Sequence, residues 1–282
     1  MEKLTSILVV AEGLDSGTKI LDKTAILARH FGARIELLVG ETRDSQGFAD
    51  LCNARGYEEV VLCSVFRSGQ SLNDVILRRV FERSPDLVVK MPANAGGSIR
   101  GKASHEDLEL AGACPVPLVL MGERPWNNPV KIAAAVDVSN EDDSALVRSI
   151  IHAAGFLNLG CEGELDVLYS EREKRDEVLR MSRAVRLARL VREFHVGGER
   201  LRHLEGAPEN TLPVVAASGE YDILVLGAIS HREGISAALH ASVTRRVLSE
   251  FGGDVVLVPA SVSAAGRTES ALPKSRAASG RD

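Results

Sequence analysis

The sequence predicts an α/β protein built from two tandem doubly wound parallel-sheet domains, each with about five strands. Short apolar runs alternate with longer amphipathic segments, which is typical of parallel strands joined by helical crossovers. The same order of elements restarts near residue 131. The length of 282 residues is also enough for about two domains of ordinary size.

The first half is expected to begin with a buried strand at 7–11, because ILVVA is apolar at every position. An amphipathic helix follows, with its apolar face running from Ile20 to Phe31 and its end at Gly32. A short polar helix precedes residue 60. Further strands are expected at 35–39, 60–65, 86–90 and 118–121, and further helices at 73–83 and 106–112.

The second half repeats this alternation with a slightly longer chain. Its strands are expected at 131–137, 165–169, 200–205, 222–227 and 254–258. Its helices are expected at 143–157, 176–195, 208–218 and 241–250. The domain boundaries that follow are 1–124 for the first domain, 125–129 for a linker, 130–260 for the second domain, and 261–282 for a disordered tail rich in Ser, Ala and Gly.

Composition and motifs exclude several classes of protein. The net charge is −5, from 34 basic and 39 acidic residues, so the basic excess of a nucleic-acid-binding protein is missing. Apolar runs are too short for a signal peptide or a membrane span, which predicts a cytoplasmic protein. No metal site is predicted, since the four cysteines form no CxxC pair and no histidines have HExxH spacing. No GxSxG nucleophile motif is present, and no catalytic residue is predicted.

Two motif-like segments have ordinary explanations. The segment 96–103 (GGSIRGKA) nearly spells a phosphate-binding loop, but Ala103 stands where a magnesium-ligating hydroxyl is needed, which indicates a glycine-rich connection. Arginines recur at every third position of the expected helix 176–195, where they could form an RNA-binding stripe. Steps of three residues carry them around the helix, so a solvated helix is predicted. They are Arg180, Arg183, Arg186, Arg189 and Arg192.

Several segments in the correct order resemble the universal stress protein family, in particular its tandem, two-domain E-type branch. In the second half these are Val136-Asp137, Gly206-Ala207-Pro208, 214–227 (VVAASGEYDILVLG) and 233–248 (EGISAALHASVTRRVL). The first half matches more loosely, through Glu12 in place of the usual Asp and 114–126 (CPVPLVLMGERPW). The resemblance implies the adenine-nucleotide α-hydrolase-like fold in both domains.

The resemblance also implies where a ligand would bind. Nucleotide-binding members of the family hold ATP at the carboxyl ends of strands one and four, with spaced glycines and a hydroxyl around the phosphates. Gly227 matches the first glycine, the second falls on Ser230, and the third falls on His240 or Ala241. In the first half Met91 takes the first glycine's place. The implied ligand or nucleotide site comprises Asp137, Val138, Gly227, Ser230, His231, His240, Ser242 and Val243.

The function expected from these residues is a non-enzymatic stress-response protein with a degraded nucleotide site and no cofactor. It would act by binding a small ligand or a partner protein. The alternative is an ATP-binding protein that uses Asp137, Gly227 and Ser242 of the second domain. Family members pair through their last strands, so 118–121 and 255–258 are expected to meet within the chain, and a homodimer of the whole chain is left open.

Overall fold

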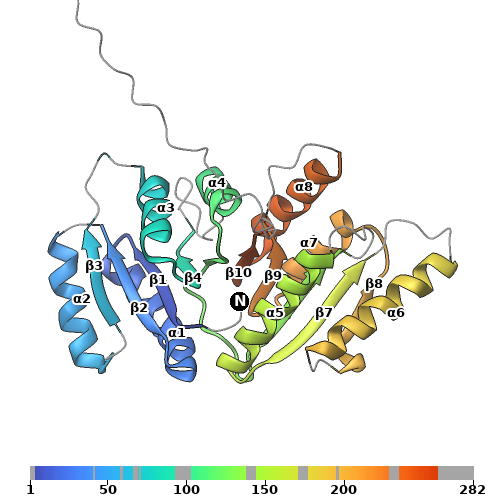
Figure 1. Cartoon of the computed structure of the whole chain (residues 1–282), viewed down its shortest axis with the longest axis horizontal. Helices are drawn as coiled ribbons and strands as arrows, with labels where there is room; N and C mark the ends of the chain where they lie inside the picture. The colour runs from blue at the N-terminus through green and yellow to red at the C-terminus, as the bar shows by residue number, and fades with distance from the viewer. Residues whose placement is uncertain are drawn as a thin grey trace, which may run out of the picture.

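A single ten-stranded sheet runs through the whole chain, in the order β3-β2-β1-β4-β5-β10-β9-β6-β7-β8 (Figure 1). The computed structural model describes residues 4–40, 42–57, 60–65, 69, 71–92, 103–137, 144–170, 177–194, 197–228 and 235–259. Helices α2 and α6 lie at the two far ends, beside the outer strands β3 and β8. The sheet therefore joins both halves of the sequence.

The first half contains β1 (Ser6–Ala11), α1 (Leu14–Phe31), β2 (Arg34–Val39), α2 (Thr42–Arg55), β3 (Val60–Val65), α3 (Leu72–Arg83), β4 (Leu87–Lys90), α4 (His105–Ala113) and β5 (Leu118–Leu120). The second contains β6 (Lys131–Val136), α5 (Ser144–Gly160), β7 (Glu164–Ser170), α6 (Glu177–Glu193), the 3-10 turn η2 (Gly198–Arg200), β8 (Leu201–Leu204), α7 (Pro208–Ser218), β9 (Ile223–Gly227), α8 (Ile235–Glu250) and β10 (Asp254–Val258). These bounds agree with the sequence-based elements to within a few residues, apart from the start of α8.

The two halves share one topology and meet through their last strands. Strand order 3-2-1-4-5 in the first half corresponds to 8-7-6-9-10 in the second. Strands β5 and β10 pair antiparallel, with Val119 opposite Val256, whereas all the other pairs are parallel. The predicted pairing of 118–121 with 255–258 within the chain is therefore confirmed. Because these two short apolar edge strands complete each other's hydrogen bonds, the two predicted parallel sheets form one mixed sheet.

Apolar side chains alternate between the two faces of the sheet, and helices cover both faces. In β1, Ile7 and Val9 point to the core under α1, α2, α5 and α6, while Leu8 and Val10 point to the core under α3, α4, α7 and α8. Strands buried on both faces read as continuous apolar runs, which is why the sequence pattern located them.

Helix α8 begins at Ile235, six positions before the expected start at Ala241. Ala237, Ala238 and Leu239 are strong helix formers, and without the family's glycines nothing in this stretch favours an irregular loop. His240, which was expected in the loop before the helix, therefore lies inside α8.

Some sequence-based expectations fall where the structure gives no description. The tail at 261–282 lies outside the described residues, as does the glycine-rich connection apart from Ala103. The arginine-rich segment is helix α6, in which Arg189 and Arg192 are exposed, as expected for a solvated helix, while Arg183 and Arg186 are half-buried and interact with other groups.

Candidate functional site

The carboxyl edge of the second half brings two predicted site residues together. Strands β6 and β9 are parallel neighbours, with Ala134 opposite Val225, so their carboxyl ends reach the same edge of the sheet. Gly227 ends β9, and Asp137 follows β6 directly. Asp137 is half-buried and already interacts with another group of the protein.

Helix α5 makes a close contact at Gly227. A Cβ atom at this position would lie 3.0 Å from Cδ2 of Leu146, which is tighter than an ordinary carbon–carbon contact. The Leu146 side chain would have to shift by a few tenths of an ångström to admit a Cβ atom, so packing alone favours a glycine here, with or without a phosphate nearby.

The other predicted site residues are less completely described. Val243 is a buried core residue of α8 that packs with the helices of one face, so it does not line an open site. Ser242 and His240 belong to α8, although the structure does not describe their side chains. Val138, Ser230 and His231 lie outside the described residues.

A buried ion pair lies at the carboxyl edge of the first half. Lys90, the last residue of β4, places its Nζ atom 2.5 Å from Oδ1 of Asp107 in α4, and both side chains are almost fully buried. Asp107 also accepts a hydrogen bond from the backbone N–H of Ser104, which completes a capping box. Two buried charges of this kind satisfy each other and leave neither free for a ligand.

Phe48 of α2 fills further space at the same edge. A Cβ atom on Gly17 of α1 would lie 2.4 Å from Cζ of Phe48 and 2.7 Å from Cβ of Ala11, the last residue of β1. Phe48 is fully buried. Glu12, the counterpart of Asp137, is exposed to solvent.

A buried polar cluster that was not predicted from the sequence lies between the two halves. Lys23 of α1 donates to both carboxylate oxygens of Asp254 at 2.9 and 3.0 Å, and to the carbonyl oxygen of Gly122 at 2.8 Å. The same carboxylate accepts from the Trp126 indole N–H at 2.7 Å and from the Gly122 N–H at 2.8 Å. Burial raises the pKa of Asp254, although Lys23, Trp126 and Gly122 oppose the shift.

Asp222 anchors the linker in a similar way. Its carboxylate accepts hydrogen bonds from Arg124, from the backbone and side chain of Asn127, and from the backbone N–H of Lys131. In the first half Asp86 binds the backbone N–H groups of Thr5 and Ser6. A signal for these anchors exists in the sequence, because an aspartate stands at or just before β4, β9 and β10.

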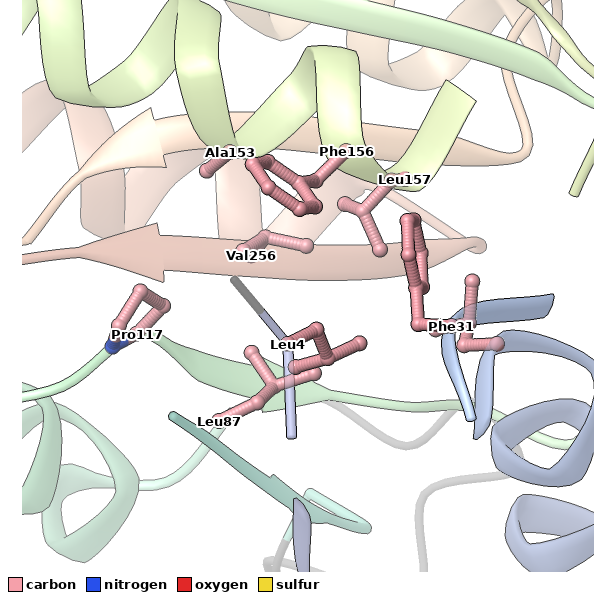
Figure 2. A pocket seen from close by; sticks show the side chains of 9 residues that line it. Leu4, Phe31, Leu87, Pro117, Ala153, Phe156, Leu157 and Val256 are labelled. Atoms are coloured by element: carbon pink, nitrogen blue, oxygen red, sulfur yellow. The ribbon is translucent and has the colours of Figure 1, made fainter. Parts of the chain in front are cut away.

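A small apolar cavity lies where α1 and α5 meet over the joined sheet (Figure 2). Its volume is about 10 Å³, and Phe31, Phe156, Leu157 and Val256 are among the residues that line it. An apolar space of this size holds at most about one water molecule, and its lining offers no polar partner for one. The contact between the halves is therefore a dry, packed interface.

Within the described ranges, no group of three or more metal-ligating side chains gathers in one place. The helices described there include none with the length and hydropathy of a membrane span.

Curated relatives support a family assignment. The chain is 26% identical over 196 residues to the universal stress protein E homolog of Haemophilus influenzae, an alignment that covers 63% of each chain. It is 24% identical over 205 residues to universal stress protein E of Escherichia coli K12, covering 66% of this chain and 64% of that protein. The match thus spans less than two thirds of each relative's length. No family profile matches the sequence.

Solved structures agree with the fold. A crystal structure named as a universal stress protein from Pseudomonas aeruginosa superposes with a TM-score of 0.76 at 24% identity, covering 92% of this chain and 94% of the other. A functionally unknown protein from the same species gives 0.72 at 25% identity, with 92% and 93% covered. A universal stress protein from Archaeoglobus fulgidus gives 0.60 at 13% identity, with 92% and 97% covered. In sequence and in fold the chain is thus similar to universal stress proteins, in particular to those of the E type.

Proposed function

We propose that this chain is a cytoplasmic stress-response protein that acts by binding a ligand or partner protein rather than by catalysis, with adenine-nucleotide binding weak or lost. The observation that carries the proposal is the Lys90–Asp107 pair at the carboxyl edge of the first half. An ATP molecule that drew on Lys90 at that edge would have to break a buried, mutually satisfied ion pair, which costs several kcal/mol. Phe48 restricts the same edge further.

The second half supports the proposal through its missing glycines. Ser230 and His240 replace two of the three glycines expected around a triphosphate, and His240 lies within helix α8. Each lost backbone-to-phosphate hydrogen bond should cost about 1.5–3 kcal/mol, as for other hydrogen bonds to charged groups. Two losses weaken binding by about two to four powers of ten, because about 1.4 kcal/mol corresponds to a factor of ten.

One arrangement favours the alternative, an ATP-binding second domain. Asp137 and Gly227 share one edge of the sheet, which is where open parallel sheets bind their ligands. Ser242 would then supply the hydroxyl for a phosphate. Under this alternative the second half binds ATP while the first half serves as its structural partner.

Native mass spectrometry of the full chain purified from cells tests the proposal. We expect the mass of the protein alone, or of the protein with a ligand other than a nucleotide. Stoichiometric ATP that survives purification, and that disappears in the Gly227→Val variant, would establish the alternative instead. The Gly252→Val variant is the matched control, because Gly252 is exposed, an added Cβ atom there meets nothing within 4 Å, and it precedes β10 at the opposite edge of the sheet.

A further inference from the structure

A second cavity lies at the opposite edge of the sheet from the predicted site. Its volume is about 560 Å³, and it opens between the end of α5, the end of α6, the turn η2 and the start of β7. Pockets that bind small molecules typically measure about 300–1,000 Å³. Because Glu164 in its wall begins β7, this cavity lies at the amino edge, whereas Gly227 and Asp137 lie where strands end.

Aromatic rings form one wall of this amino-edge cavity. The ring centroid of His152 lies 4.9 Å from that of Phe156 and 5.6 Å from that of Phe194, so α5 and the residue that follows α6 contribute a continuous ring surface. Leu159, which also lines the cavity, is 61% exposed. Binding of an apolar group beside these rings would remove the exposed Leu159 side chain from water, which is favourable.

Among the described residues that line the cavity, acidic side chains outnumber those of Lys and Arg. Glu164, Glu193 and Glu199 line it, against the single guanidinium of Arg200. Arg200 lies 3.3 Å from Glu164, and Glu193 pairs with Arg148 outside the cavity. The Glu199 carboxylate lies directly against Gly197, because a Cβ atom added to Gly197 would be 2.1 Å from Oε1 of Glu199. Two of the three carboxylates are thus paired with arginines, so a positively charged ligand would be attracted mainly by Glu199.

One hydrogen-bond acceptor in the wall lacks a donor. Oδ1 of Asn158 is buried and has no partner in the described part of the chain. A buried acceptor left without a donor typically costs about 1–3 kcal/mol. Because this oxygen is itself shielded from solvent, it can accept from an N–H group in the cavity only after the carboxamide rotates, and its lack of a donor is what would favour that rotation.

We propose that the amino-edge cavity binds a small organic amine with an aromatic body. The ring would pack on Phe156, Phe194 and Leu159, and the ammonium group would donate hydrogen bonds to Glu199 and Asn158. This site is separate from the nucleotide question, because it lies at the other edge of the sheet.

Calorimetric titration of the full chain with tryptamine and with indole-3-propionate tests the proposal, since the two probes share a ring and differ in charge. We expect saturable binding of tryptamine and at least tenfold weaker binding of indole-3-propionate, a difference of about 1.4 kcal/mol or more. Equal binding of both probes, or no binding of tryptamine at millimolar concentrations, would overturn the proposal.

Two variants locate the binding. Gly155 lines the cavity, and a Cβ atom there meets nothing within 4 Å, so Gly155→Leu adds an apolar side chain at the cavity wall and improves helix propensity. We expect this variant to abolish tryptamine binding and Glu199→Gln to weaken it about tenfold. The control is Glu106→Gln, at an exposed carboxylate on α4. Unchanged binding by the Gly155→Leu variant would place tryptamine elsewhere and refute the proposal.

Discussion

Replacing Lys23 by methionine should destabilise the chain far more than an ordinary surface substitution. The Lys23 and Asp254 side chains are only 9% and 1% exposed, and they join α1 of the first half to β10 of the second. Methionine has a similar length, so the change removes the charge and its hydrogen bonds while largely preserving the volume. The Asp254 carboxylate would then keep only the Trp126 and Gly122 donors.

The expected loss follows from the burial of the remaining charge. Removing one partner of a buried ion pair costs about 3–5 kcal/mol, which corresponds to a drop in Tm of roughly 6–20 °C for a chain of this size. The loss should shrink in acid. Burial raises the pKa of Asp254 above that of the unfolded chain, so protonation favours the folded state and removes the unpaired charge as the pH falls.

Urea denaturation followed by tryptophan fluorescence measures the effect at the site itself, because Trp126 is the single tryptophan and binds Asp254. Lys19→Met is the matched control. Lys19 lies one turn away on α1 and pairs at 2.8 Å with Glu123, but the two side chains are 41% and 52% exposed, so its loss should cost less than about 1 kcal/mol. Equal losses of unfolding free energy in the two variants would contradict the claim that burial of the Lys23–Asp254 pair determines the effect.

Three further predictions test buried groups elsewhere. Burial raises the pKa of the Cys114 thiol to about 11, so the folded chain should lose stability as the pH rises from about 9 to 11. In urea titrations at each pH, Cys114→Ala should reduce this dependence of the unfolding free energy on pH. Gly227→Ala should cost about 1 kcal/mol through contact with Leu146, and the added Leu146→Ala change should remove that cost in a double-mutant cycle. Gly17→Ala should lower the Tm through overpacking worth about 1–3 kcal/mol, and less so in a Phe48→Ala background; equal effects in both backgrounds would contradict the close contact.

Apolar patterning was sufficient to predict most of the fold, because strands buried on both faces read as nearly continuous apolar runs. The joining of the two sheets also has a sequence signal in the short apolar strands β5 and β10. Helix α8 was harder to predict, because the resemblance suggested a phosphate-binding loop in a stretch whose own residues favour a helix. Local propensity prevailed where the glycines were missing.

Contacts between distant parts of the chain could not be predicted in the same way. Lys23 and Asp254 are 231 positions apart, and neither looks unusual in its own segment. The same holds for Lys90, which becomes informative only once its strand is known to be covered on both faces. A lysine that ends such a strand requires a buried carboxylate, and Asp107 supplies it.

Calorimetric titration of the full chain with MgATP tests most directly whether the carboxyl edges of the sheet have lost the ability to bind a nucleotide. We expect no saturable heat at micromolar MgATP, because the first edge holds the Lys90–Asp107 pair and the second lacks two phosphate-binding glycines. A one-to-one complex with micromolar Kd, abolished by Gly227→Val, would contradict this expectation.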